Sequence, residues 1–306
     1  MMRYSIIFLL SSAIMLISTS CESEFELKGM DDEDRLHITF IPSTFMLPHE
    51  MAITGARSVN KPAQEYQSPS NLSIRLTADG EEIALEAKDQ DHFLAHYEFI
   101  PGQIVRIEAS ADGFRPAYAE TVIPEPVKEF KTTIVKSDED YNSRLKVTVE
   151  YPDNPETKDM YGALVVCETV DTHTGTRFSE TGDIYPIYDD FGETECRTAS
   201  FNNFDIAYWN DSKETSGGRQ KMEFEFTGTV YDVGSHTVEI KYQVLLLKVS
   251  PEFYRYYNGQ WDADNNALSF IGLSAPTFTY TNIMGGIGVL GSISYAESGW
   301  IADPLD

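Results

Sequence analysis

Two histidines provide the first set of side chains with metal-binding chemistry. His92 and His96 would share one face of either a strand or a helix. Carboxylates lie nearby in the sequence at Asp89, Asp91 and Glu98. Imidazole and carboxylate groups are zinc ligands, but ordinary surface histidines produce the same pattern. We expect surface histidines here and no metal site.

A second set of oxygen ligands occurs in Asp262-Ala-Asp-Asn-Asn266, where they occupy alternate positions as in calcium-binding loops. An EF-hand would continue with a glycine and a bidentate glutamate, but this chain has Ala267 and Leu273 at those positions. We therefore interpret the stretch as a solvated helix end. The sequence predicts no metal and no other cofactor.

Catalytic motifs with a fixed spacing are missing from the sequence. It contains no Gly-x-Ser-x-Gly elbow, no His-Glu-x-x-His pair and no nucleotide-binding loop. Because acidic residues are numerous, a carboxylate pair for glycoside hydrolysis stays open as an alternative. We expect a protein that is not an enzyme.

The two cysteines beyond the N-terminal segment, Cys167 and Cys196, come with no motif of a thiol enzyme. In an oxidising compartment they could form a disulfide. Cys167 could equally be a small buried hydrophobe, because it lies in the apolar run Leu164-Val-Val-Cys167. The sequence leaves both interpretations open.

The charge of the chain is strongly negative. Its 306 residues include 23 Lys and Arg against 49 Asp and Glu. Arg3 is the only charged residue among residues 1–20, so without this segment the net charge is 22 minus 49, or −27. Such a charge repels phosphate backbones, which excludes nucleic acid as a partner. It suits a soluble surface, and it would also favour cationic ligands.

The N-terminal segment indicates where the protein resides. Arg3 precedes an apolar run that ends at Ile17, and small residues then lead to Cys21. The run is shorter than the roughly 20 residues that a bilayer-spanning helix needs. We predict a removed signal peptide, residues 1–20, and a lipid anchor on Cys21 that makes the membrane a partner. Ser18 stands where lipoprotein sites usually have leucine, so an ordinary secretory signal is the alternative.

The next part of the chain predicts a tether and a first domain. Residues 21–35 form an acidic tether, because the like charges of Asp31-Asp-Glu-Asp34 cannot pack together. Residues 36–124 alternate apolar and polar side chains in short segments, and Ala78-Asp-Gly80 is a hairpin signal. This spacing predicts an immunoglobulin-like β-sandwich that ends at Pro124-Glu-Pro126.

Residues 125–306 predict a second β-rich domain, either a sandwich or a partly open barrel. Within it, residues 171–220 are too long for a simple connection, so they form either a functional loop or further strands. Several aromatic side chains on this stretch are candidates for an outward-facing ligand loop. These are Tyr185, Tyr188, Phe191, Tyr208 and Trp209.

One substantial helix is expected near residues 251–266. Ser250 can cap its N-terminus and Pro251 suits the first helical position. Three aromatic side chains would share one face and pack on a sheet rather than bind a ligand. They are Phe253, Tyr257 and Trp261.

A glycine-rich segment follows near the C-terminus, with Gly285, Gly286, Gly288 and Gly291. It lacks the Lys-Ser/Thr of a phosphate-binding loop, and its apolar residues alternate as in a strand. We expect these glycines to permit a close approach and to seat the aromatic face of the helix. The side chain of Asn282 would tie down the turn.

These C-terminal motifs resemble those of a known family. They are Ser250-Pro-Glu-Phe-Tyr-Arg-Tyr-Tyr257 and Tyr280-Thr-Asn-Ile-Met-Gly-Gly-Ile-Gly-Val-Leu-Gly291. Together they are similar to the Bacteroidota lipoproteins of domain of unknown function 4249, with Leu290 in place of the usual Phe. Pro101-Gly-Gln-Ile-Val-Arg-Ile-Glu-Ala109 adds a match in the first half. The resemblance implies no catalytic residues.

The same resemblance carries an expectation about function. Genes of this family are commonly found beside those for TonB-dependent receptors, which implies a partner barrel in the outer membrane. Acidic residues next to Cys21 resemble the tag that exports such lipoproteins to the outer leaflet. We expect a surface binding or accessory lipoprotein for nutrient uptake. A periplasmic-facing location, a structural or adhesion role and a hydrolase are the alternatives.

Overall fold

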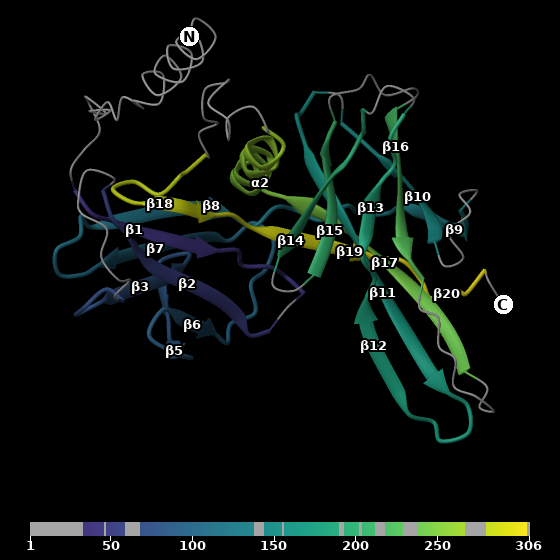
Figure 1. Cartoon of the computed structure of the whole chain (residues 1–306), viewed down its shortest axis with the longest axis horizontal. Helices are drawn as coiled ribbons and strands as arrows, with labels where there is room; N and C mark the ends of the chain where they lie inside the picture. The colour runs from purple at the N-terminus through teal and green to yellow at the C-terminus, as the bar shows by residue number, and fades with distance from the viewer. Residues whose placement is uncertain are drawn as a thin grey trace, which may run out of the picture. The chain divides into compact units, whose positions relative to one another are not determined.

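The computed structural model describes residues 33–45, 47–58, 68–137, 144–154, 156–189, 193–201, 204–211, 218–228, 238–266 and 280–304. All of these except Ser58 belong to one compact unit, which comprises residues 33–57 and 64–306. Among the described residues the fold is mainly β, with four sheets and one helix, as predicted (Figure 1). No helix in this part of the chain is long and apolar enough to cross a membrane.

Two sheets enclose the first hydrophobic core. Their strands are β1 (Arg35–Phe40), β2 (His49–Ala56), β3 (Ser73–Ala78), β4 (Glu81–Ile83), β5 (Leu85–Ala87), β6 (His92–Ala95), β7 (Ile104–Ser110), β8 (Ala117–Val122) and β18 (Ile287–Leu290). The strand orders are β18–β1–β2–β6–β5 and β4–β3–β7–β8. In β1 the alternate residues Leu36, Ile38 and Phe40 are fully buried, because every second side chain of a strand faces the same side. This arrangement is the predicted sandwich.

The strand β18 comes from the far end of the chain. It lies parallel to β1, with Ile287 opposite His37 and Leu290 opposite Phe40. Leu290 is fully buried in the first core. The predicted domain boundary near residue 124 stays a prediction, but residues from the C-terminal segment complete the first sandwich.

Two further sheets enclose the second hydrophobic core. Their strands are β9 (Lys131–Lys136), β10 (Arg144–Pro152), β11 (Met160–Asp171), β12 (Arg177–Thr181), β13 (Ile184–Pro186), β14 (Arg197–Phe201), β15 (Phe204–Asn210), β16 (Arg219–Thr227), β17 (Val238–Val249), β19 (Ile293–Glu297) and β20 (Ile301–Ala302). The strand orders are β13–β16–β10–β9 and β14–β15–β11–β17–β19, with β12 on β11 and β20 on β17. The stretch 171–220 thus contains strands, which was one of its two interpretations.

The helix α2 (Pro251–Asp264) begins where the sequence predicts. The Ser250 hydroxyl accepts a hydrogen bond from the Phe253 amide at 3.3 Å, which is the usual N-cap contact. Its buried side chains are Phe253 and Tyr256, whereas Tyr257 and Trp261 are half-buried. Trp261 lies against the Arg197 guanidinium, 5.9 Å from its ring centroid. Arg197 belongs to β14, so this end of the predicted aromatic face also packs on a sheet.

The glycine-rich segment makes close backbone contacts, although mostly with partners other than the helix. A Cβ added at Gly291 would lie 3.0 Å from the Phe253 Cβ, so this glycine seats the helix as expected. A Cβ at Gly285, Gly286 or Gly288 would instead collide with backbone carbonyls. Those carbonyls belong to Pro116, Leu36 and Ile38. The expectation that all four glycines seat the helix is thus wrong for Gly285, Gly286 and Gly288. These three glycines instead allow the segment that leads into β18 to pack closely against β1 and β8.

Candidate functional site

The aromatic residues predicted to form a ligand loop separate in the structure. Tyr208 and Trp209 are 0% and 3% exposed on β15, so their assignment to an outward-facing loop is wrong. As consecutive residues of a buried strand, their side chains point to opposite faces of the sheet. The Trp209 indole donates to the Tyr151 hydroxyl. Tyr185 lies on β13 and Tyr188 is exposed just after it. Phe191 lies outside the described residues.

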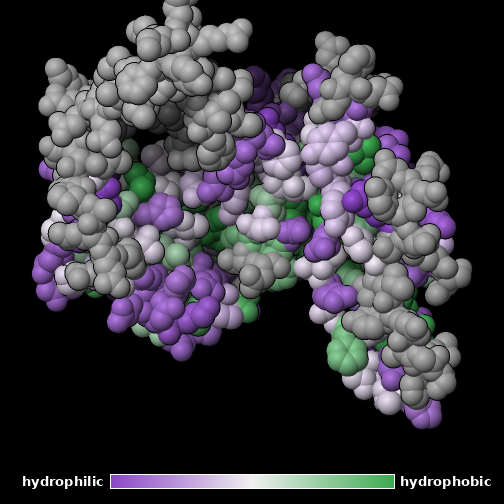
Figure 2. Space-filling view, viewed as in Figure 1, coloured by the Kyte–Doolittle hydropathy of each residue, from purple (hydrophilic) through white to green (hydrophobic). Residues whose placement is uncertain are grey.

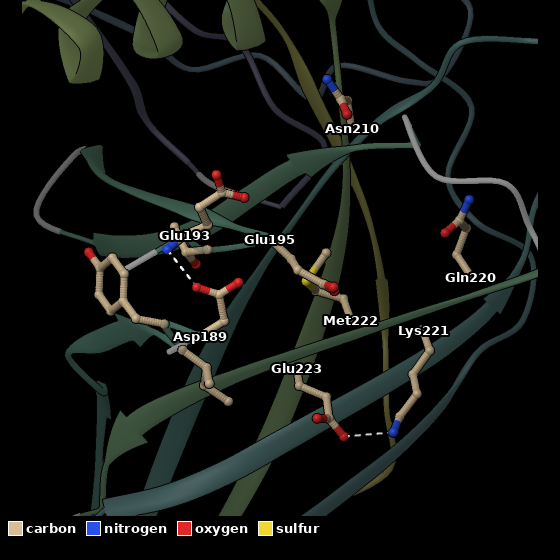
Figure 3. A pocket seen from close by; sticks show the side chains of 11 residues that line it. Asp189, Glu193, Glu195, Asn210, Gln220, Lys221, Met222 and Glu223 are labelled. Carbon is tan, nitrogen blue, oxygen red and sulfur yellow. Dashed lines mark hydrogen bonds and ion pairs between the residues drawn. The ribbon is translucent and has the colours of Figure 1, made fainter. Parts of the chain in front are cut away.

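Tyr188 lines a surface hollow of about 580 Å³. The hollow lies between the segment after β13, the end of β15 and the first half of β16 (Figure 3). Its other described lining residues are Ile187, Asp189, Glu193, Thr194, Glu195, Asn210, Gln220, Lys221, Met222 and Glu223. The hollow contains a predicted site residue, so it is the candidate functional site.

A tight hairpin forms one wall of the hollow. The Asp189 amide donates to the Glu193 carbonyl, and the Glu193 amide donates to the Asp189 Oδ1, both at 2.8 Å. Tyr188 and Thr194 pair as an isolated antiparallel bridge. Figure 3 shows Asp189 and Glu193 on one side of the hollow, with Gln220, Lys221 and Glu223 on the other. These hydrogen bonds between Asp189 and Glu193 hold the two sides of the wall together.

Acidic side chains dominate the lining. Four carboxylates, from Asp189, Glu193, Glu195 and Glu223, face one ammonium group, from Lys221. Glu223 is bound by Lys221 at 2.7 Å and by Lys146 at 2.9 Å. Partial burial raises the pKa of Glu223, but hydrogen bonds from these lysines and Thr148 outweigh it and lower the pKa to about 2. Glu223 therefore stays ionised at neutral pH and is paired with these two lysines. With Asp189, Glu193 and Glu195 the lining still has more acidic than basic side chains, which suits a cationic ligand.

A cluster of three carboxylates adjoins the hollow through Gln220. The Gln220 side-chain amide donates to Asp153 at 3.2 Å, and the ligand atoms of Asp153, Asp159 and Asp211 lie within 4.8 Å of one another. Such oxygens could hold a divalent cation, but the Lys248 ammonium already lies 2.6 Å from Asp159. The cluster thus acts as an ion-pair network in this structure.

Sequence reasoning missed this carboxylate cluster. Asp153 follows β10 and Asp159 precedes β11, whereas Asp211 follows β15 and is far from both in the sequence, so the three share no motif. Burial raises the pKa of Asp211. The nearby Tyr161 hydroxyl donates to Asp153 at 2.9 Å. Only the pairing of β11 with β15 brings these groups together.

His92 begins β6 and His96 directly follows it. A hydrophilic patch covers the region of β5 and β6 (Figure 2). His92 contacts Asp89 at 2.8 Å and His96 contacts Glu86 at 3.0 Å. Each imidazole thus has its own carboxylate, and the two do not converge. At the end of α2, Asp262 binds Arg197 at 2.7 Å.

The cysteines Cys167 and Cys196 are both buried, and neither forms a disulfide. The disulfide interpretation is therefore wrong for this structure, and the interpretation as small buried hydrophobes holds. Burial raises the pKa of the Cys196 thiol to about 12, which keeps it protonated and unreactive. Cys21 lies outside the described residues.

Fold and site together define a protein with four described β-sheets around two hydrophobic cores and an acidic surface hollow. A family model described as "Domain of unknown function (DUF4249)" matches residues 22–298. The chain belongs to this family, which confirms the resemblance of its C-terminal motifs. A comparison with curated proteins finds no match.

Proposed function

We propose that this chain is a lipid-anchored outer-membrane protein at the cell surface, which binds a ligand and is not an enzyme. The anchor is Cys21, and the acidic tether that follows it supports display on the outer leaflet. A TonB-dependent receptor barrel is the proposed partner, on the strength of the family resemblance alone. The accessory role in nutrient uptake follows from that partner.

The acidic hollow is the observation that carries the binding role. It has about 580 Å³ of space, which falls in the range of small-ligand pockets. Its four carboxylates against one ammonium group favour a positively charged ligand. Tyr188 is 54% exposed at its rim and offers an aromatic face to such a ligand.

The anchor is tested with the Cys21→Ala variant. We expect the parent protein in the detergent phase of a membrane extract and the variant in the aqueous phase, because two or three acyl chains hold a protein far better than none. Intact cells treated with an external protease would lose the parent protein if it faces outward. A variant that stays in the detergent phase contradicts the anchor, and protection from protease indicates the periplasmic face.

The binding role is tested by isolating the native lipoprotein from outer membranes and identifying the proteins that accompany it. We expect a receptor barrel in the parent sample. The Glu193→Gln, Glu195→Gln double variant tests the hollow, and Glu129→Gln, at an exposed position in the linker before β9, is its matched control. Recovery of no partner with any of these proteins favours a structural or adhesion role instead.

A further inference from the structure

The hollow lies along an open edge of a sheet. β16 pairs with β10 along its whole length, from Thr227 opposite Arg144 to Arg219 opposite Pro152. On its other side it pairs with β13 only from Phe226 to Phe224. Among the described residues, no strand pairs with the remaining half of this edge, which ends in the hollow.

Backbone hydrogen bonds show which groups point from β16 to that edge. The Thr227 amide donates to Asp183 on the β13 side, whereas the Gly218 carbonyl accepts from Asp153 on the β10 side. Successive residues of an antiparallel strand alternate between its two neighbours. Thr227, Glu225, Glu223 and Lys221 therefore direct their backbone groups to the same edge. The amide and carbonyl groups of Lys221 and Glu223 thus point into the hollow.

The strand β13 ends at Pro186, short of these groups. The pair of Pro186 with Phe224 is the last of the ladder, and the next position, Ile187 opposite Glu223, is not formed. The chain instead leaves the edge and enters the hairpin that carries Asp189 and Glu193. The departing segment leaves a gap beside β16, and this gap is the hollow (Figure 3).

We propose that an extended basic peptide segment of a partner protein binds here as an added strand of the β16 sheet. The inference rests on the proposed binding function and names its ligand class. The amides and carbonyls of Lys221 and Glu223 would form the ladder, and alternate lysine or arginine side chains would meet the carboxylates of the facing wall. These two residues span about 7 Å of strand, so a peptide of roughly four residues covers them.

Charge complementarity favours a basic peptide over an acidic or apolar one. Asp189, Glu193 and Glu195 lie on the hairpin side, and Glu223 is already neutralised by two lysines. A basic segment would meet opposite charges on these three side chains, whereas an acidic segment would meet like charges. Main-chain pairing gives affinity with little sequence specificity, and the carboxylates select for charge.

The test uses the detergent-solubilised lipoprotein and a capped heptapeptide in which lysine alternates with valine. We expect saturable binding in calorimetry, weakened about tenfold or more by the Glu193→Gln, Glu195→Gln double variant and unchanged by Glu129→Gln. Raising the salt concentration from 50 to 500 mM should weaken binding by a similar factor.

Backbone pairing is tested separately from charge. N-methylation of alternate peptide amides in one register should abolish binding, and the same modification in the other register should leave it intact. Hydrogen exchange of the Lys221 and Glu223 amides should slow when the peptide is added, whereas the Met222 amide, which faces β10, is slow throughout. Equal binding of both N-methylated peptides would overturn the added strand. Absence of binding while a receptor still co-purifies would overturn the peptide ligand but not the proposed function.

Discussion

At the residue scale, the C-terminal motif is a device for close packing. The Asn282 side chain donates to the Leu290 carbonyl at 2.9 Å and accepts from the Leu290 amide at 3.0 Å, so it ties both ends of the glycine segment together. Gly288 has a φ of +104° and lies against the Ile38 carbonyl. Both the conformation and the contact exclude a side chain there.

Gly288→Ala is therefore expected to destabilise the protein strongly. Gly113→Ala is the matched control, because Gly113 also has a positive φ, +81°, but has no atom within 4 Å of an added Cβ. The control should cost about 1–2 kcal/mol from backbone strain alone. Gly288→Ala should cost at least about 2 kcal/mol more, because its Cβ meets backbone that cannot move aside. Urea unfolding measures both; equal losses would contradict the packing role.

A second residue-scale feature is the buried histidine His49. It is 1% exposed, its Nε2 lies 3.2 Å from the Tyr97 carbonyl, and its Nδ1 has no hydrogen-bond partner among the described residues. Burial lowers the pKa of His49 to about 4, although the bond to Tyr97 opposes this shift. The folded state thus holds a neutral imidazole in the first core.

This predicts an acid-sensitive core. Because the folded pKa lies below the ordinary value of 6.5, the stabilising contribution is complete above pH 6.5 and is lost as the pH falls toward 4. The free energy of unfolding should fall by up to about 3 kcal/mol across this window relative to His49→Gln, which does not titrate. Urea midpoints from pH 4 to 7 measure the difference. A constant difference between the two proteins would contradict the buried neutral histidine.

At the scale of elements, the start of α2 also anchors the strand that follows β18. The Ser250 hydroxyl accepts from the Phe253 amide and from the Ser292 amide, and the Ser250 amide donates to the Ser292 carbonyl. The Ser292 hydroxyl in turn donates to the Val122 carbonyl at 2.7 Å. One cap therefore joins the helix, the edge strand β8 and the passage from β18 to β19.

Ser250→Ala should lower the stability of the protein by more than the loss of an ordinary N-cap does. Loss of an N-cap costs about 1 kcal/mol, and the unpaired Ser292 amide adds about 1–3 kcal/mol because it is buried. Ser250→Thr, which keeps the hydroxyl, is the control and should recover most of the stability. Thermal unfolding of the three proteins tests this. A loss no larger than that of an exposed cap would show that the contact with Ser292 contributes little.

At the scale of the whole molecule, the two cores share chain segments. β18 belongs to the first pair of sheets, and β19 follows directly in the second. The segment that follows β1 runs parallel to the segment between β18 and β19. The Gly291 amide donates to the Phe40 carbonyl, the Ile293 amide to the Pro42 carbonyl, and the Thr44 amide to the Ile293 carbonyl. Two parallel segments thus pass together from one core to the other.

This predicts that the first sandwich does not form without the C-terminal segment. A chain that ends at residue 126 lacks β18, which exposes the edge of β1 and removes Ile283 and Leu290 from the core. We expect it to show no cooperative unfolding transition, whereas removing only residues 299–306, which carry β20, should retain one. Circular dichroism during heating distinguishes the two. A cooperative transition of the shorter chain would support an independent domain that ends near residue 124.

Much of the fold follows from local sequence properties. Alternation in segments such as Leu36 to Phe40 depends only on the period of a strand, and Ser250-Pro251 depends only on helix-end chemistry. The signal segment with Cys21 and the family motif likewise consist of consecutive residues, and the negative charge follows from the composition alone. The sequence by itself therefore determined the β class, the helix and the expected anchor.

The candidate site depended on the tertiary structure. Tyr208 and Trp209 belong to the core because β15 pairs with β11, and no local pattern distinguished this strand from a loop. The open edge at Lys221 and Glu223 exists because β13 ends at Pro186 while β16 continues. Such pairings join residues far apart in the chain, and their register depends on the summed packing of both cores rather than on any one segment. The sequence thus determined which elements form, and only the packing decided which edge and which carboxylates remain available to a ligand.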